Sequence, residues 1–555
     1  MQLERPWLKS WPKQFNPDTE VDKKPLYSLL IDSASKYPSK VCLHYQGRGL
    51  TYSQVDDRAS RFASALISLG LQRGDRVAIF LPNIPQFVIA YYGILKAGGI
   101  IVTCSPLYKE RELEYQLKDS AAKIVIAARD VVKGNDLYKS LEGCRERLDL
   151  EHVISTSVTD YLPSAKRALA GLAGVRNVAR AGTLDFAALS RRSGPIAKPA
   201  DVNPERDVAL LQYTGGTTGI AKGAMLTHYN MYSNAIYTGM ALPITDSDVA
   251  LAVLPLYHIY GMTATMNAPL SAGAEIVLLP QFHVEEVMKT IQRKRVTSFC
   301  AVPAMYIALI NNPKVKDFNL RSVRACISGG AALPVAVRKR FIELTGGNLV
   351  EGYGLSEASP VTHCNPVHDG VVKDGSIGLP FPETDAIIVD LDDPDKALKV
   401  GEVGEVAVRG PQVMKGYWNR PDETVMVLRK GWLLTGDIGK MDEEGYFFIV
   451  DRKKDMVNVG GLKVYPREVE EVLFEHPAVK EAAVVGMPDS FSGEVVRAFV
   501  VLKDPAAKVS EKDIIDFCAP KLSRYKVPKK VEFVPDLPKT LIGKVLRRKL
   551  REPTS

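Results

Sequence analysis

LQYTGGTTGIAKG, residues 211–223, is the stretch that says most about this chain of 555 residues. Glycines let the backbone approach an anion closely, and successive backbone N–H groups can form a nest around phosphate oxygens. Three threonines add hydroxyl donors, and Lys222 adds a positive charge. Lys222 follows Gly219 by three residues, so the spacing differs from the G-x-x-x-x-G-K-[ST] of P-loop NTPases. The stretch therefore predicts a phosphate-binding loop of another kind.

Strand-like and helix-like segments alternate on the N-terminal side of this loop. Residues 77–81, 100–103 and 122–127 are short apolar runs of strand length, whereas 85–96 and 111–119 have helical patterns. Alternation of this kind is typical of an α/β fold with a mostly parallel sheet.

The pattern changes near residue 451. A strand-like run at 446–450 is followed by a charged turn and then by a shorter α+β pattern. A unit of about a hundred residues fits the usual size of a domain. We therefore predict a large domain over 1–451, a hinge at 452–454 and a mobile C-terminal domain over 455–555.

Composition favours a globular protein of the cytoplasm. The hydrophobic share is 46% and the charged share 25%, close to average usage. Seven dispersed cysteines argue for a reducing compartment and against a disulfide framework or a zinc site. The first residues contain no apolar run of the kind found in secretory signals. The net charge of +8 is concentrated near the C-terminus without interleaved aromatic residues, so we expect no nucleic-acid partner.

Residues 161–180, YLPSAKRALAGLAGVRNVAR, combine apolar residues at helical spacing with four basic residues. A basic amphipathic helix can lie in a membrane interface, although such a segment is more often a surface helix packed on its own domain. Peripheral contact with the inner face of the membrane is therefore a hypothesis for this segment, and a homodimer is a candidate assembly.

The loop resembles the nucleotide-binding signature of the adenylate-forming superfamily of acyl- and aryl-CoA synthetases, luciferases and peptide-synthetase adenylation domains. Gly215 and Ala221 replace the Ser and Pro usual in that signature, and the variant YTGGTTGxAKGA resembles bacterial long-chain fatty-acid CoA ligases most. Further matching motifs follow in the family's order, to the end of the chain. They lie at residues 254–261, 328–333, 350–360, 431–438, 451–455, 458–466 and 538–547.

The resemblance implies an α/β fold, with a large N-terminal domain of mostly parallel sheets and helices and a small α+β C-terminal domain on a hinge. It also implies ATP, Mg²⁺ and coenzyme A as ligands. The residues that it places on the nucleotide and CoA are Thr214, Gly215, Gly216, Thr217, Thr218, Gly219, Lys222, Gly330, Ala331, Gly352, Tyr353, Gly354, Leu355, Ser356, Asp437, Arg452, Lys454, Gly460, Gly461 and Lys544.

By resemblance, these positions have separate roles around the nucleotide. Tyr353 would stack on adenine, while Glu357 and Thr214 would reach the Mg²⁺ on the phosphates, in keeping with the preference of Mg²⁺ for carboxylate and phosphate oxygens. Asp437 would accept hydrogen bonds from both ribose hydroxyls, and Arg452 would be the second ribose contact.

The remaining matched positions concern the acid and the second half of the reaction. By resemblance, His258 borders the acyl pocket, Lys544 contacts the substrate carboxylate and the α-phosphate, and Lys454 is the hinge residue. Gly461 would line the pantetheine tunnel once the small domain has turned, and Gly460 replaces a common Ser beside it. The expected catalytic residues are thus Lys544, Thr214, Glu357, Lys222 and His258.

These motifs imply an ATP-dependent, AMP-forming ligase that activates a medium- to long-chain fatty acid as an acyl-adenylate and transfers it to CoA. The apolar run at 302–310 supports a fatty substrate. An aryl acid of the hydroxycinnamate (4-coumarate) type is the close alternative, because its ligases share every catalytic motif. A luciferase-like adenylating oxygenase is the alternative from a different class.

Overall fold

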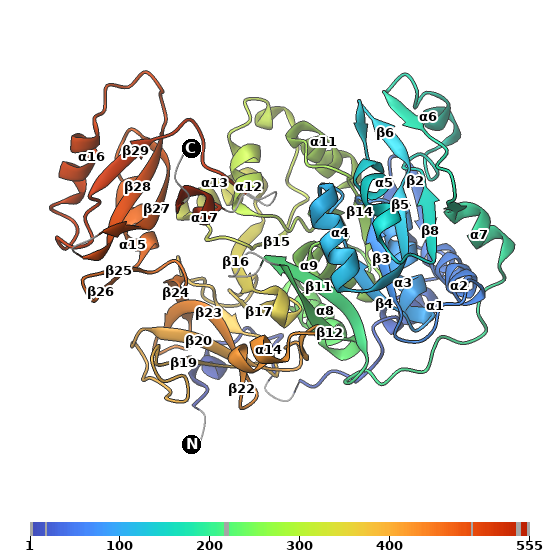
Figure 1. The fold of residues 1–555 in the computed structure, drawn as a ribbon, viewed down its shortest axis with the longest axis horizontal. Helices are drawn as coiled ribbons and strands as arrows, with labels where there is room; N and C mark the ends of the chain where they lie inside the picture. Colours follow the sequence, from blue (N-terminus) through green and yellow to red (C-terminus); the bar gives the residue numbers. More distant parts are fainter. Residues whose placement is uncertain (1–3, 17–18, 216–220, 490–491, 540–544, 552–555) are drawn as a thin grey trace.

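The computed structural model describes residues 4–16, 19–215, 221–489, 492–539 and 545–551. A large body holds most of the chain, and a smaller body near the C-terminus stands beside it (Figure 1). The mixed α/β architecture and the division into a large and a small part agree with the fold class that the sequence predicts.

The first sheet of the large body has eight strands in the order β10-β8-β5-β3-β4-β11-β12-β21. Neighbours from β10 to β11 are parallel, while β12 and β21 each run antiparallel to the strand before them. The strands are β3 (Arg76–Phe80), β4 (Ile100–Thr103), β5 (Ala122–Ala128), β8 (His152–Thr156), β10 (Leu184–Asp185), β11 (Val208–Gly215), β12 (Ala221–Thr227) and β21 (Gly416–Tyr417).

Both faces of this sheet are buried, which explains its continuous apolar runs. Along β3, Val77 and Ile79 belong to the largest hydrophobic cluster, whereas Ala78 and Phe80 belong to a second cluster on the other face. Side chains alternate between faces along a strand, so this strand must be apolar at every position. The predicted strands at 77–81, 100–103 and 122–127 are confirmed here.

A second set of strands extends from β2 through β1, β14 and β13, and Ser298 joins it by single bridges to β15. The order then continues β15-β16-β17-β18. These strands are β1 (Val41–Tyr45), β2 (Arg48–Thr51), β13 (Val249–Ala252), β14 (Glu275–Leu278), β15 (Ala325–Ser328), β16 (Asn348–Gly354), β17 (Val361–Cys364) and β18 (Leu379–Pro380).

A third, antiparallel sheet closes the lower side of the large body in the order β19-β20-β23-β22, with β24 paired to β23 (Figure 1). Its strands are β19 (Asp385–Val389), β20 (Gly404–Arg409), β22 (Leu428–Arg429), β23 (Trp432–Met441) and β24 (Phe447–Arg452). Short strands β6 (Asp130–Val132), β7 (Asn135–Asp136) and β9 (Val175–Asn177) form a separate three-stranded sheet.

Helices of the large body cover these sheets. They are α1 (Ser28–Lys36), α2 (Tyr52–Ser68), α3 (Pro85–Lys96), α4 (Glu110–Asp119), α5 (Lys139–Cys144), α6 (Ser164–Ala168), α7 (Phe186–Arg192), α8 (His228–Ala241), α9 (Ile259–Gly261), α10 (Ala268–Ser271), α11 (Val284–Lys294), α12 (Pro303–Ile310), α13 (Val335–Thr345) and α14 (Pro421–Val427). The 3₁₀ turns are η1 (Pro6–Lys9), η2 (Arg145–Arg147), η4 (Val315–Asp317) and η5 (Ser356–Ala358), and η3 (Met262–Asn267) is a π-helix.

Local sequence explains where several helices begin. Thr51 and Thr227 start α2 and α8, and each side chain accepts from the backbone three residues on, in a capping box. Pro85 occupies the first turn of α3, where its missing N–H costs nothing. All twelve residues of α3 are buried, so this helix lies inside the large body.

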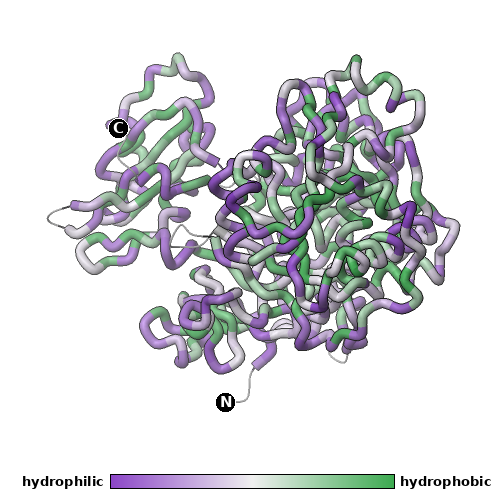
Figure 2. Tube along the Cα trace, turned by 45° about the vertical axis from the view of Figure 1, so that its right-hand side comes forward, coloured by the Kyte–Doolittle hydropathy of each residue, from purple (hydrophilic) through white to green (hydrophobic). Residues whose placement is uncertain are grey.

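The smaller body is an antiparallel sheet in the order β26-β25-β28-β27, with β29 parallel to β28. Its strands are β25 (Val457–Val459), β26 (Leu462–Val464), β27 (Val479–Asp489), β28 (Gly493–Leu502) and β29 (Lys530–Phe533), and its helices are α15 (Pro466–Phe474), α16 (Glu511–Cys518) and α17 (Arg547–Arg551). Its strands carry a separate hydrophobic core, which Figure 2 shows as green segments within a mostly purple outline.

The helix predicted over 161–180 is wrong in extent. Only α6, with five residues, is helical, and turns and the short strand β9 follow it. Gly174 adopts a φ of +75°, which ends any helix there, and β9 pairs with β6 instead. Leu169 and Leu172 are left 56% and 88% exposed. Within the described ranges, no helix is long and apolar enough to cross a bilayer.

Candidate active site

Strands β11 and β12 form a hairpin that brings the two ends of the predicted phosphate loop together. Thr214 pairs with Lys222, and Gly215 pairs with Ala221, in the antiparallel register. Gly216, Thr217, Thr218 and Gly219, at the tip of the predicted loop, lie outside the described residues. The hairpin therefore places a hydroxyl group and an ammonium group, eight positions apart in the sequence, on neighbouring strands.

The carboxylate of Glu357 lies beside this hairpin. Its Oε1 atom is 3.5 Å from Thr214 Oγ1 and accepts a 2.8 Å hydrogen bond from the Tyr417 hydroxyl. Glu357 comes from η5, directly after β16, and its backbone carbonyl accepts from Met414 N at 2.8 Å. Thr214 and Glu357 are separated by 143 residues, so the tertiary fold brings the two predicted metal-site residues together.

Lys222 contacts Tyr417, which belongs to β21, and Glu423, which belongs to the following helix α14. Its Nζ atom pairs with the Glu423 carboxylate and lies 5.4 Å from the centre of the Tyr417 ring. Burial lowers the pKa of Lys222, the Glu357 charge opposes that shift, and Arg420 adds to it. The predicted phosphate lysine therefore has a carboxylate partner in this structure.

The predicted ribose acid meets the predicted adenine residue. Tyr353 of β16 donates a 2.5 Å hydrogen bond to Asp437 Oδ2, and Arg452 Nε is 3.5 Å from Asp437 Oδ1. Strand pairing explains the second contact, because Asp437 of β23 is directly opposite Arg452 of β24. Burial raises the pKa of Asp437, and Arg452 opposes that shift. Three residues from three motifs thus form one polar cluster.

Glycines shape the backbone around Tyr353. A Cβ atom on Gly354 would lie 2.1 Å from the Pro360 carbonyl oxygen, and one on Gly352 would lie 2.7 Å from an Ile327 methyl group. These approaches leave no room for a side chain, so glycine is required at both positions. Leu355 and Ser356 follow, with Leu355 N donating to Pro360 O at 3.0 Å, and lead the chain into the turn that carries Glu357.

The predicted acyl-pocket histidine is neutral near pH 7. Burial lowers the pKa of His258 to about 4. Its Nδ1 atom accepts a 3.3 Å hydrogen bond from Tyr260 N, so the neutral ring carries its proton on Nε2. His258 can therefore donate to a carboxylate without carrying charge.

Two predicted segments meet through Tyr260. Its hydroxyl donates to Ile327 O at 2.7 Å, and a Cβ atom on Gly329 would lie 3.2 Å from its ring. Gly330 has a φ of +80° and, with Ala331, continues the turn that leaves β15. The histidine motif (254–261) and the glycine-rich motif (328–333) therefore pack against each other and form one wall of the candidate active site. The π-helix η3 follows this wall, and such helices are frequent at functional sites.

Asn83 is a residue of this wall that the sequence did not reveal. Its side-chain nitrogen donates to Ala252 O at 3.1 Å and to Leu254 O at 2.8 Å, and its oxygen accepts from Leu256 N at 2.8 Å. The side chain is 2% exposed, so these buried bonds hold the backbone segment that leads to His258 in place. The tripeptide Leu81-Pro82-Asn83 after β3 was the only signal.

The predicted hinge and CoA residues lie in or next to the small body. Burial lowers the pKa of Lys454, and the Arg452 charge adds to that shift. Gly460 and Gly461, with φ of +59° and +87°, form the turn between β25 and β26. Figure 1 places this turn far from the β11–β12 hairpin, so the structure does not bring Gly461 to the phosphate site. Lys544 lies outside the described residues.

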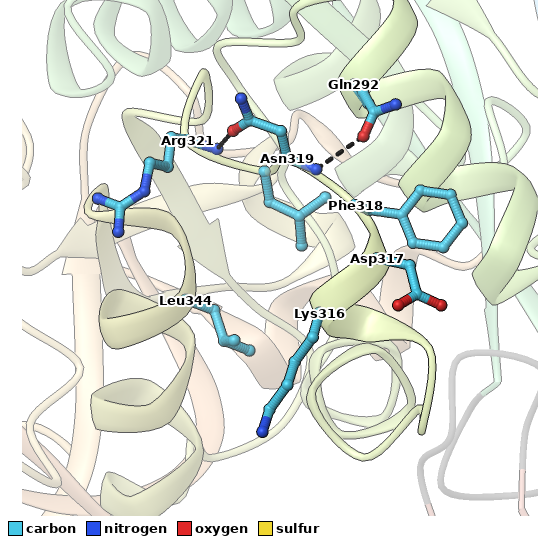
Figure 3. Close-up of a pocket in the computed structure, with 8 residues that line it drawn as sticks. Gln292, Lys316, Asp317, Phe318, Asn319, Arg321 and Leu344 are labelled. Carbon is cyan, nitrogen blue, oxygen red and sulfur yellow. Dashed lines mark hydrogen bonds between the residues drawn. The ribbon is translucent and has the colours of Figure 1, made fainter.

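A surface cavity of about 390 Å³ lies elsewhere on the large body (Figure 3). Asn319 N donates to Gln292 Oε1 at 2.7 Å, and Arg321 N donates to Asn319 Oδ1 at 3.1 Å along its wall. None of the predicted site residues lines it. We therefore assign the candidate active site to the groups around the hairpin and not to this cavity.

Two stretches of the chain match family models. Residues 30–418 match the AMP-binding enzyme model, and residues 468–544 match the model of the AMP-binding enzyme C-terminal domain. The chain belongs to the AMP-binding enzyme family. The first of these matches contains the hairpin, Glu357 and Tyr417.

Relatives of this AMP-binding enzyme match it along its whole length. It is 45% identical to a long-chain-fatty-acid–CoA ligase of Bacillus subtilis (strain 168), with 100% of this chain and 98% of the relative covered. A long-chain-fatty-acid–CoA ligase of Escherichia coli O157:H7 is 40% identical, with 99% and 98% covered. The crystal structure of ATP-bound MatB from Rhodopseudomonas palustris aligns with a TM-score of 0.84 at 31% identity, covering 96% of this chain and 98% of that one.

Glu351 is a second site residue that the sequence did not reveal. This carboxylate, in the middle of β16, is opposite Ser328 at the end of β15 and accepts a 2.9 Å hydrogen bond from Leu333 N. It therefore supports the turn that contains Gly330 and Ala331. Burial raises the pKa of Glu351 from 4.5 to about 7.

Glu351→Gln is expected to stabilise this AMP-binding enzyme at pH 8 but not at pH 4.5. A carboxyl group with a raised pKa binds its proton more tightly when folded, so stability falls as the pH rises from about 4.5 to about 7. Glutamine imitates the neutral acid, and the gain at pH 8 should be about 3 kcal/mol. Differential scanning calorimetry at both pH values measures it.

Glu405→Gln is the matched control, because the Glu405 carboxylate pairs with Lys453 Nζ at 2.9 Å and accepts from Gly436 N at 2.9 Å. Losing that charge should lower the melting temperature at pH 8. An equal shift for Glu351→Gln at both pH values would contradict the role of ionisation.

Proposed function

We propose that this protein is an ATP-dependent, AMP-forming ligase that joins a medium- to long-chain fatty acid to coenzyme A through an acyl-adenylate. The observation that carries the proposal is the meeting of Thr214, Lys222 and Glu357 at the end of the β11–β12 hairpin. A hydroxyl, an ammonium group and a carboxylate side by side suit a metal-bound polyphosphate. The names of the relatives that match the whole chain support the fatty acid and CoA as co-substrates.

The residues present fit a magnesium ion. Mg²⁺ is commonly held by one or two carboxylates together with substrate phosphate oxygens, and the half-buried Glu357 supplies one such carboxylate next to the Thr214 hydroxyl. When bound, the ion would neutralise phosphate charge. Within the described residues, no cluster of three or more His, Cys, Asp or Glu side chains suited to a metal was found, so these two residues with ATP oxygens are the proposed ligands.

In the first half-reaction, a carboxylate oxygen of the acid attacks the α-phosphorus of ATP, and the bond to the bridging oxygen breaks to release pyrophosphate. The protein mainly positions groups and stabilises charge in such a transfer. We assign phosphate contacts to Lys222 and the loop residues, ribose contacts to Asp437 and Arg452, and the α-phosphate to Lys544. Neutral His258 can donate from Nε2 to the acid and so orient it.

In the second half-reaction, the CoA sulfur attacks the acyl carbon and AMP leaves. We propose domain boundaries at 1–451, 452–454 and 455–555, with rotation of the small domain about Lys454. The position of the turn between β25 and β26, which contains Gly461, supports this, because Figure 1 shows these strands away from the β11–β12 hairpin. In the structure the small body has its own core and sheet, as a rotating unit requires.

An assay with ATP, Mg²⁺, CoA and a panel of fatty and aromatic acids tests the proposed function. We expect AMP, pyrophosphate and a fatty acyl-CoA, with the highest kcat/KM for the long chains. AMP with an aryl-CoA would keep the chemistry and overturn the substrate. Light emission or oxygen consumption would favour the luciferase-like alternative, and ADP would overturn the assignment of the loop.

Peripheral contact with a membrane is a second proposal, and it now rests on exposed side chains and not on a helix. Leu169 and Leu172 protrude beside the exposed Lys166 and Arg176. Apolar side chains next to basic ones suit an anionic bilayer surface. Arg180 does not contribute, because it is buried against Asp136 and the Tyr138 ring. The homodimer stays a prediction.

Replacing both leucines, Leu169→Ser with Leu172→Ser, is expected to lower binding to vesicles of anionic phospholipid at least about fivefold, because burying a leucine side chain is worth about 1.5–3 kcal/mol. Co-sedimentation with vesicles containing phosphatidylserine measures it. A matched control is Val425→Ser with Met426→Ser, two residues that are 69% and 72% exposed in another region. Equal binding of all three proteins would contradict the proposal.

A further inference from the structure

The motif Gly416-Tyr-Trp-Asn-Arg-Pro-Asp-Glu-Thr424 carries no assigned role, yet it touches the candidate active site at two points. Tyr417 donates to Glu357 Oε1 at 2.8 Å, and Glu423 pairs with Lys222 Nζ. The Lys222 side chain is 12% exposed and that of Glu423 is 31% exposed, so the pair is mostly shielded from water. Such a pair is worth more than one on the open surface.

Local structure explains how one short motif reaches both groups. Tyr417 lies in β21, opposite Ala224 of β12, which carries Lys222 two residues earlier. Thr424 Oγ1 accepts from Tyr417 N at 2.9 Å and donates to Arg420 O at 2.8 Å, so α14 folds back on β21. This turn brings Glu423, in the first turn of α14, next to Lys222.

Neighbouring charges keep Glu423 in place. Arg420 Nε is 3.8 Å from Glu423 Oε1, while its terminal nitrogen pairs with Asp119 at 2.6 Å. Asp119 also accepts from the Tyr213 hydroxyl at 2.7 Å, on the strand that leads into the loop. The Glu423 carboxylate therefore belongs to a fixed network and is not a free surface acid.

We propose that Glu423 is a positioning residue that holds Lys222 against Tyr417 until the phosphates of ATP take the ammonium group. The inference rests on the proposed function, in which Lys222 binds phosphate. Any N–H donor of the Lys222 ammonium group that is directed at the Glu423 carboxylate is not available to a phosphate oxygen, so ATP competes with this carboxylate for the lysine. The pair thus weakens ATP binding, while it keeps the lysine at the mouth of the loop.

A double-mutant cycle on ATP binding tests this inference. Isothermal titration calorimetry of the full chain, without acid or CoA, gives the ATP Kd for wild type, Glu423→Gln, Lys222→Met and the double variant. Glu423→Gln should tighten ATP binding roughly threefold to tenfold, because no carboxylate competes for the lysine. In the Lys222→Met background the same change should alter the Kd by less than about twofold.

Two control variants distinguish the effect of the Glu423 position from the general effect of removing one negative charge. Asp422→Asn removes an exposed charge next to Glu423 and should leave the Kd within about twofold. Glu444→Gln breaks a similar Lys–Glu pair elsewhere, in which Lys373 pairs with Glu444 at 2.5 Å and lies 4.5 Å from the centre of the Tyr446 ring. This change should also leave the ATP Kd nearly unchanged.

The outcomes distinguish this inference from the proposed function. If wild type binds ATP and forms AMP, but Glu423→Gln tightens binding equally with and without Lys222, general charge explains the effect and the inference is wrong. Weaker ATP binding by Glu423→Gln would also overturn it. If wild type forms ADP or fails to bind ATP, the proposed function falls and this inference falls with it.

Discussion

Lys544→Ala is expected to abolish formation of the acyl-adenylate while sparing thioester formation from supplied acyl-adenylate and CoA. A positive charge at the crowded α-phosphate acts only in the first half-reaction, and losing one such group commonly costs about 10²–10³ in rate. Pyrophosphate release measures the first half-reaction, and acyl-CoA formation from synthetic acyl-adenylate measures the second. The second rate should change by less than about threefold.

The residues on either side of Lys544 give this experiment its control. Leu546 N donates to Pro538 O at 2.7 Å, and Lys539 forms a bridge with Val545, so the two described ends of the motif meet. Lys539 Nζ also pairs with Glu481 at 2.6 Å. Lys539→Ala removes a nearby lysine of the same motif and should leave both half-reactions nearly unchanged.

Equal loss of both half-reactions in Lys544→Ala would contradict this division of labour. Such a result would point to a lysine needed for folding of the small domain or for both of its orientations. Circular dichroism of the variant would separate these two explanations, because a folding defect changes the spectrum.

Arg547→Met is expected to destabilise the junction of the two bodies by about 3–5 kcal/mol. The guanidinium lies 2.8 Å from Glu470, 3.1 Å from Asp455 and 3.6 Å from Asp451, with only 18% of its side chain exposed. Asp451 belongs to β24 of the large body, whereas Glu470 and Arg547 belong to helices of the small one. Removing the arginine leaves buried carboxylates without compensation, which is the costly way to break such a cluster.

Hydrogen exchange followed by mass spectrometry measures this effect on peptides covering 447–475. Exchange there should accelerate about 10²-fold or more at pH 8. Burial raises the pKa of Asp451 and of Glu470 even with the arginine present. Folded carboxyl groups with raised pKa values gain stability as the pH falls, so the defect should be smaller at pH 5 than at pH 8.

Arg147→Met is the control for a surface cluster of similar composition. Arg147 contacts Glu110 and Glu114, but its side chain is 47% exposed. Exposed ion pairs contribute little, so this change should cost less than about 1 kcal/mol. Equal protection in wild type and Arg547→Met would show that the buried cluster does not hold the junction.

Much of the architecture could be predicted from the sequence because its signals are local. The strand at β3 and the helix at α3 follow from continuous apolar runs and a proline, which depend on neighbours within a few residues. The glycine- and threonine-rich loop predicted a phosphate site for the same reason. The roles expected of Glu357 and Asp437 came from motifs, and the structure brings Glu357 beside Thr214 and Asp437 beside Arg452.

Contacts between distant segments could not be predicted from the local sequence. Nothing around Tyr417 or Glu423 shows that one meets Glu357 and the other meets Lys222, because a short strand pairing with β12 decides both. At residues 161–180, a local pattern predicted an element that the tertiary structure does not form. Their spacing favoured a helix, but pairing of β9 with β6 and a positive φ at Gly174 decided otherwise. The sequence by itself thus determined the local elements and the candidate functional groups. Only the packing of segments far apart in the chain decided which of these groups touch, because each contact depends on the position of both partners.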